Sequence, residues 1–173
     1  MRKMIVGTLL VVFLLSGCSN AMADIYDNES KITSDTNSFN LDGIEQEIEG
    51  NSYNATIEKM EGMDTVWTLD TEEETTVDIS YDITLYNGKI KVALIYPDGE
   101  LTTLAECKSN QDNSSNSTSL TLPQGEYRIK IIAGENTKFD ISLSITDGSF
   151  HELGLWQILS CQTKTKYYEF TPQ

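Results

Sequence analysis

Apolar and polar residues alternate along much of the chain after residue 51, a pattern typical of strands with one buried and one exposed face. The alternating segments are residues 53–57, 77–81, 90–96, 127–131 and 139–145. This alternation is typical of antiparallel sheets that pack one face on a core and expose the other to water. We therefore expect an all-β fold, an antiparallel β-sandwich or jelly roll. Its expected core includes the aromatic residues Trp67, Tyr81, Tyr96, Tyr127 and Phe139.

Turn residues lie between these segments. Asn87-Gly88 is typical of a two-residue hairpin. Pro97-Asp98-Gly99 predicts a tight turn, because proline presets the bend and glycine accepts a positive φ. Residues 108–119 hold Asn, Ser, Gln and Asp without a large apolar residue, so we expect an exposed loop there.

The region before residue 51 has a different pattern. Residues 19–40 are rich in small polar residues, which predicts a flexible tether. Leu41, Ile44 and Ile48 have helical spacing and indicate a short helix. The expected organisation is a signal segment over 1–17, a tether over 18–50 and a β-sandwich over 51–173, with no clear pattern from about residue 147 onward.

The first residues form an export signal. Arg2 and Lys3 precede an apolar run from Met4 to Leu15, which is shorter than the ~20 residues of a spanning helix. The tetrad Leu15-Ser16-Gly17-Cys18 resembles the lipobox of bacterial lipoproteins. That resemblance implies cleavage before Cys18, a diacylglyceryl group on its thiol, and a domain held on a membrane outside the cytoplasm. Two acyl chains are sufficient for stable anchoring.

Charge narrows the range of partners. The chain has a net charge of -15, and without Arg2 and Lys3 ten basic residues face 27 acidic ones, or -17. Such a surface repels phosphate backbones, so we expect no nucleic-acid partner. With Cys18 acylated, Cys107 and Cys161 remain, either as a disulfide that the exported location permits or as buried thiols.

Candidate catalytic chemistry is sparse, and we expect no enzyme. His151 is the one histidine, and no nucleophile-elbow motif accompanies it. We expect no cofactor; calcium is the metal that the composition would support, through loop oxygen atoms. The candidate calcium ligands are Asp70, Glu72, Asp98 and Glu100.

The middle of the chain resembles bacterial pre-peptidase C-terminal domains and related small jelly rolls. The resemblance covers about residues 65–146 and rests on residues 91–99, where an apolar strand ends in an Asp-Gly turn, and on residues 122–129, where Gly-Glu-Tyr opens a strand. It implies a jelly-roll fold and a non-catalytic role linked to secretion, substrate contact or adhesion.

Two functions fit these observations. The first is a membrane-anchored lipoprotein whose non-catalytic sandwich makes protein or surface contacts. The alternative is a carbohydrate- or peptidoglycan-binding module, for which Tyr86 and Trp67 are the candidate stacking residues. An aromatic residue on an alternating strand also suits a core, whereas Tyr86 borders the Asn87-Gly88 turn and is expected to be exposed.

Overall fold

The computed structural model describes residues 22–108 and 110–154. A 3-10 turn, η1 (Ala23–Ile25), and a short helix, α1 (Glu29–Ile32), precede one eight-stranded antiparallel sheet. The strands are β1 (Ser38–Glu49), β2 (Ser52–Thr71), β3 (Thr75–Asn87), β4 (Ile90–Ile95), β5 (Leu101–Cys107), β6 (Asn113–Leu122), β7 (Gly125–Ile145) and β8 (Ser149–Phe150).

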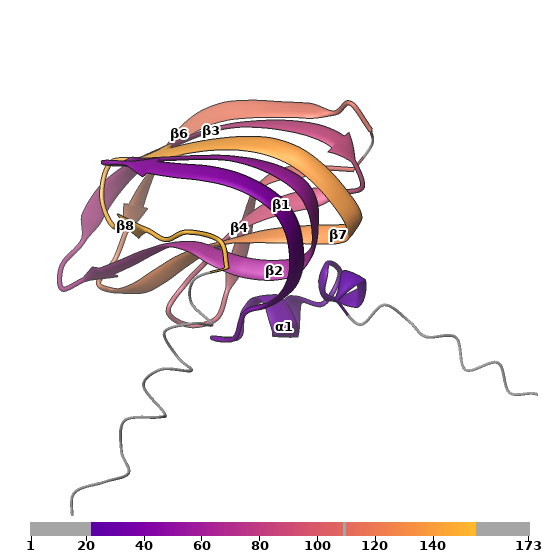
Figure 1. Ribbon diagram of the computed structural model, residues 1–173. Helices are drawn as coiled ribbons and strands as arrows, with labels where there is room; N and C mark the ends of the chain where they lie inside the picture. Colours follow the sequence, from indigo (N-terminus) through magenta and orange to yellow (C-terminus); the bar gives the residue numbers. More distant parts are fainter. Residues whose placement is uncertain (1–21, 109, 155–173) are drawn as a thin grey trace, which may run out of the picture.

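Two long strands fold this sheet into a sandwich. β2 and β7 are 20 and 21 residues long, and both bend from one layer into the other (Figure 1). Register shifts in β2 between Ile57 and Gly62 accompany the bend, as expected for bulges. The first layer holds β1, β2, β7, β3 and β6, whereas the second holds the other halves of β2 and β7 with β4, β5 and β8. The predicted antiparallel β-sandwich of jelly-roll class is confirmed.

The apolar half of each alternation forms the core between the layers. Of the five predicted core aromatics, Trp67, Tyr81, Tyr127 and Phe139 are buried and Tyr96 is half-buried against the same cluster. The alternation therefore identifies the inner face of the strands correctly.

The predicted Asn87-Gly88 hairpin is wrong. β3 and β4 do not pair with each other: both pair with β7, β3 along residues 138–145 and β4 along residues 128–133. Gly88 has a φ of +83° and passes close to Thr137 of β7, where an added Cβ would clash. Asn87-Gly88 thus marks a kink where the chain passes from β3 in the first layer to β4 in the second, while β7 remains the pairing partner of both.

The turn at Pro97-Asp98-Gly99 is confirmed, whereas the predicted loop over 108–119 is wrong beyond residue 112. β4 and β5 pair antiparallel around the turn, and Tyr96 N–H donates to the Glu100 carbonyl at 3.0 Å. Residues 113–122 form β6, which pairs with β3 through ten consecutive residues. β6 lies at the margin of the first layer, so strand pairing does not require a continuous apolar stripe there.

The predicted helix over residues 41–49 is also wrong, because these residues belong to β1. β1 pairs antiparallel with β2 in a single register from Ser38 to Glu49. Gly43 has a φ of +62°, and a Cβ there would lie 2.8 Å from the Glu58 Cβ. Leu41 and Ile44 are three positions apart, on either side of this glycine, and both are half-buried against the core. A helical spacing therefore arises within a strand.

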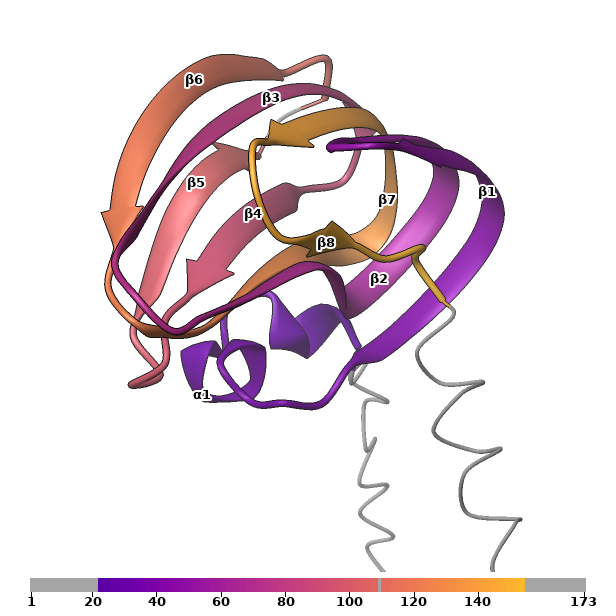
Figure 2. The same cartoon turned by 90° about the vertical axis from the view of Figure 1, so that its left-hand side faces the viewer.

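The predicted flexible tether over residues 18–50 is wrong for its described part. Residues 22–37, here called the N-terminal strap, pack against the sandwich, and residues 38–49 form β1. Ile25, Tyr26 and Ile32 are buried, and they pack with Met63, Ala93, Ile95 and Ile132 on the outer face of the second layer. Figure 2 shows η1 and α1 beneath that layer. The strap is folded because this sheet face carries apolar residues that need a cover.

The signal segment, Cys18 and Cys161 lie outside the described residues. Within residues 22–108 and 110–154, no helix is long and apolar enough to cross a bilayer.

Candidate binding site on the polar face

The outer face of the first layer is built from the polar half of the alternation. Cross-strand register places the side chains of its strands in rows that run from β1 to β6. One row is Glu45, Thr56, Asp140, Thr84 and Asn113; the next is Glu47, Asn54, Ser142, Asp82 and Ser115; the third is Glu49, Ser52, Ser144, Ser80 and Ser117. We call this surface the polar face. No described element covers it (Figure 1).

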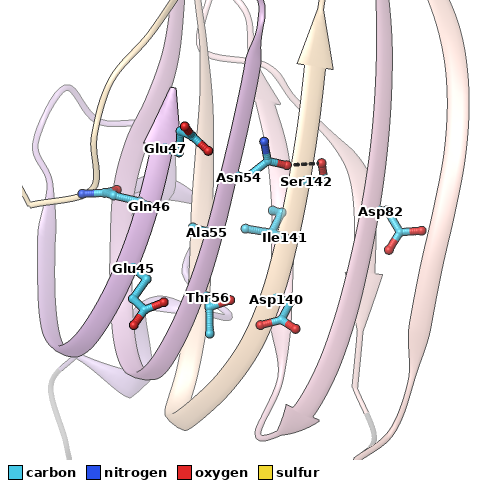
Figure 3. A pocket seen from close by; sticks show the side chains of 10 residues that line it. All are labelled: Glu45, Gln46, Glu47, Asn54, Ala55, Thr56, Asp82, Asp140, Ile141 and Ser142. Carbon is cyan, nitrogen blue, oxygen red and sulfur yellow. Dashed lines mark hydrogen bonds between the residues drawn. The ribbon is translucent and has the colours of Figure 1, made fainter. Parts of the chain in front are cut away.

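An open pocket lies on the polar face across β1, β2, β7 and β3. Four carboxylates line it, and no lysine or arginine does. The acidic residues are Glu45, Glu47, Asp82 and Asp140. Figure 3 shows them around Asn54, Thr56 and Ser142, with the Ser142 hydroxyl bonded to the Asn54 side-chain oxygen. The pocket is rich in acceptors and carries negative charge.

Asp140 is the best-defined carboxylate of the pocket. Its Oδ2 accepts a 2.6 Å hydrogen bond from the Tyr86 hydroxyl. Its Oδ1 is buried and has no hydrogen-bond partner among the described residues. Buried acceptors are nearly always satisfied, so Oδ1 is a site that favours a donor from water or a ligand.

Tyr86 borders this pocket as the predicted exposed aromatic. It is 44% exposed, and the hydrogen bond to Asp140 raises the pKa of its hydroxyl. Lys138 lies 6.0 Å from the Tyr86 ring centroid and pairs with Glu58 at 2.5 Å. The cation nearest to Tyr86 in this arrangement is therefore neutralised by an acid of its own.

A second open pocket continues the first toward β6. It shares Asp82 and Ser142 with the first pocket and is otherwise lined mainly by serines and Asn116. Hydroxyl and amide groups both donate and accept hydrogen bonds. The two pockets together form a strip across the strands in which acceptors dominate at one end and mixed donors and acceptors at the other.

Trp67 does not belong to this surface. It is fully buried, and its indole N–H donates to the Asp147 carbonyl at 2.9 Å. Its assignment as a stacking residue is corrected, because a ring without an exposed face has no surface for a ligand. Its alternative placement in the core is the one observed.

The other sequence candidates lie away from the polar face. Asp70, Glu72, Asp98 and Glu100 are exposed at strand ends and turns, and the described residues contain no cluster of three or more His, Cys, Asp or Glu side chains placed to hold a metal. His151 Nε2 lies 2.8 Å from the Thr68 hydroxyl, and burial lowers its pKa. Cys107 is a buried thiol whose pKa is raised by burial. Its pairing with Cys161 stays a prediction.

Sequence reasoning missed Asn54, Asp82, Asp140 and Ser142. The signal that would have identified them is the polar half of the same alternation that identified the core. Residues directly opposite across neighbouring strands share a face, but that register becomes known only from the structure.

No family model matches the chain, and no curated protein matches it. Solved structures resemble it in part. A family 4 carbohydrate-binding module is 15% identical over 61% of this chain and 74% of that chain, with a TM-score of 0.35. A family 6 module from Cellvibrio mixtus lichenase 5A with cellotriose is 13% identical over 75% and 95%, with a TM-score of 0.33. A family 61 module with beta-1,4-galactotriose is 9% identical over 62% and 86%, with a TM-score of 0.36. Similarities at this level carry no information about a ligand.

Proposed function

We propose that the chain is a non-catalytic binding module whose polar face binds a glycan without negative charge. The observation that carries the proposal is the acceptor-rich pocket around the unpaired Asp140 Oδ1, which no lysine or arginine lines. Sugars present several hydroxyl donors at close spacing, and carboxylate acceptors form the stronger class of hydrogen bond with them. A phosphate, sulfate or uronate group would meet repulsion from the carboxylates instead.

The arrangement of the rows fits a chain-like ligand. Neighbouring strands are ~4.8 Å apart, so five strands present a strip roughly 19 Å wide from β1 to β6. Hydrogen-bonding side chains recur at every strand of the strip. Tyr86 adds an exposed ring at its margin, next to Asp140, against which a sugar face can pack.

Isothermal titration calorimetry with neutral, amino-bearing and uronate oligosaccharides tests this function. Asp82→Ala removes a carboxylate shared by both pockets, and we expect it to weaken binding of a neutral glycan about tenfold. Asp98→Ala is the matched control: it removes the same charge from an exposed turn and leaves affinity unchanged. Equal affinities for both variants, or preference for uronates, would contradict the proposal.

A second candidate is contact with a basic protein surface, which the four carboxylates of the pocket favour. Ionic strength separates the two candidates. Exposed charge pairs weaken as salt rises, whereas hydrogen bonds to a neutral sugar change little. Binding that disappears between low and moderate salt would favour the protein partner.

We further propose that lipid on Cys18 holds this module at a membrane outside the cytoplasm. The support is the run Met4–Leu15 followed by Leu15-Ser16-Gly17-Cys18. Cells fed a clickable fatty acid are expected to label the wild-type chain and not Cys18→Ser. Equal labelling of both would remove the anchor from the proposal.

A further inference from the structure

Strand β6 presents a free sheet edge. It forms one margin of the first layer and pairs with β3 alone among the described strands. Its ten residue pairs with β3 run without a register shift. Alternate residues of an antiparallel edge strand direct their N–H and C=O groups away from their single neighbour, so β6 offers an uninterrupted row of backbone donors and acceptors.

β6 lacks the devices that protect the other margins. β1 carries four acidic residues, and the backbone of Leu153 forms hydrogen bonds with the Gln46 side chain of this strand. The β4–β5 ladder has a register shift at Val92/Ala93, and β5 contains Glu106. β6 has no charged residue, no proline and no bulge, and among the described strands longer than two residues it alone is uncharged.

We propose that β6 is an interface between two copies of this chain, which pair edge to edge and antiparallel about a two-fold axis. A two-fold interface sets each patch against itself, so the patch must be self-complementary. Ser, Thr and Asn satisfy this condition because each both donates and accepts hydrogen bonds, and they make up eight of the ten residues Asn113–Leu122. A strand of carboxylates facing its own copy would repel it.

Charge also favours a second copy at this margin and not elsewhere. The chain carries a net charge of -15, so copies repel one another over most of their surface. The neutral strip along β6 removes that repulsion locally. Leu120 of β6 and Leu104 of β5 are half-buried at the core side of this margin, and pairing would cover them further.

Pairing would also join two polar faces. Ser115 and Ser117 line the second pocket, so this pocket lies beside the proposed two-fold axis. The first layers of both copies would form one continuous sheet. The inference is independent of which ligand the polar face binds.

Light scattering on the full chain in detergent micelles tests the interface. The polypeptide mass is expected to rise from one copy to two between about 10 µM and 1 mM, a range typical of weak specific contacts. Ser117→Lys places an exposed charge on β6 and is expected to raise the dimer dissociation constant about fivefold. Ser144→Lys is the matched control, because Ser144 lies in the same row on β7, two strands away, and leaves dimerisation unchanged.

Circular dichroism confirms that each variant is folded, and Ser119→Lys replaces Ser117→Lys if the latter is not. A mass of one copy at every concentration overturns the proposal. Dimers that persist equally in the β6 variant, or that weaken equally in Ser144→Lys, also overturn it, because the contact would then lie elsewhere.

Discussion

The two outer faces of the sandwich differ in what their alternating residues require. On the second layer, the outward positions Met63, Ala93 and Ile132 are apolar, and the N-terminal strap covers them. On the first layer, the outward positions are hydroxyls, amides and carboxylates, and no described element covers them. The outward-facing residues of each layer therefore decide whether another element covers it. Burial stabilises apolar area, whereas polar area is stable in contact with water.

The strap is held by polar contacts as well as by its apolar residues. Lys130 is fully buried, and its ammonium group donates to the carbonyls of Ser34 and Thr36 at 2.7 and 2.9 Å. Arg128 pairs with Asp35 and donates to the Thr33 carbonyl. The Tyr26 ring lies 4.0 Å below the Lys89 ammonium, and its hydroxyl bonds to Glu106 at 3.0 Å. These contacts fix the strap in one register.

The largest effect on stability is expected when a tyrosine is truncated to alanine on the strap-covered face, compared with the same truncation on the polar face. Tyr26→Ala removes a buried ring, its hydrogen bonds and its contact with Lys89, and is expected to lower the free energy of unfolding by ~3–5 kcal/mol. Tyr86→Ala on the polar face removes an exposed ring and is expected to cost less than about 1 kcal/mol. Urea unfolding of both variants measures the contrast. Similar losses would mean that the strap contributes no more than a surface residue.

Lys130 gives a pH-dependent test of the covered face. Burial is the main cause that lowers its pKa to about 8, with Arg128 contributing, while Asp35 and Asp64 oppose the shift. Between about pH 8 and its usual pKa near 10.4, the folded chain has released this proton and the unfolded chain still binds it. The contribution of Lys130 to stability therefore rises with pH across that window, by on the order of 3 kcal/mol.

The measurement is the difference in unfolding free energy between wild type and Lys130→Met at several pH values from 7 to 10.5, which cancels the titration of other groups. Below pH 8 the difference is expected to be flat. A flat difference across the whole range would show that Lys130 is solvated.

The smallest effect concerns repulsion on the polar face. Asp82→Asn removes one of four pocket carboxylates, and Asp140 lies diagonally across from it through Ser142. We expect stabilisation by a few tenths of a kcal/mol at low salt and less at high salt, because like charges on neighbouring strands destabilise and salt screens them. Chemical denaturation at two ionic strengths checks the sign. A loss of stability would mean that the carboxylate supports the fold.

The sequence predicts the inner face better than the margins. Alternation at 77–81 and 139–145 identified buried strands because core burial demands apolar residues at every second position. β6 was not predicted as a strand because an edge strand rich in Ser and Asn pairs through its backbone and needs no alternation of apolar residues. β1 resembled a helix because Leu41 and Ile44, three positions apart on either side of the positive-φ residue Gly43, are both half-buried.

Long-range partners explain the remaining errors. Asn87-Gly88 has the chemistry of a hairpin turn, but the strand that determines its role is β7, about fifty residues away. The strap resembles a tether because three buried residues, Ile25, Tyr26 and Ile32, are few for sixteen. They suffice because the second layer supplies the rest of the apolar cluster. The residues of the polar face were not identified from the sequence either, because strand register alone brings Asn54, Asp82 and Ser142 together.

The early start of the folded domain has a consequence for the lipid-anchored form proposed above. With lipid on Cys18, five residues lead to Ala23, and even a fully extended chain of that length reaches only ~17 Å. The N-terminal strap and the polar face lie on opposite sides of the sandwich (Figure 1). In the proposed lipid-anchored form, the strap would therefore lie near the headgroups and the polar face would point away from the bilayer. So short a connection would restrict how the anchored domain can tilt, and would keep the polar face accessible to ligands on the side away from the lipid.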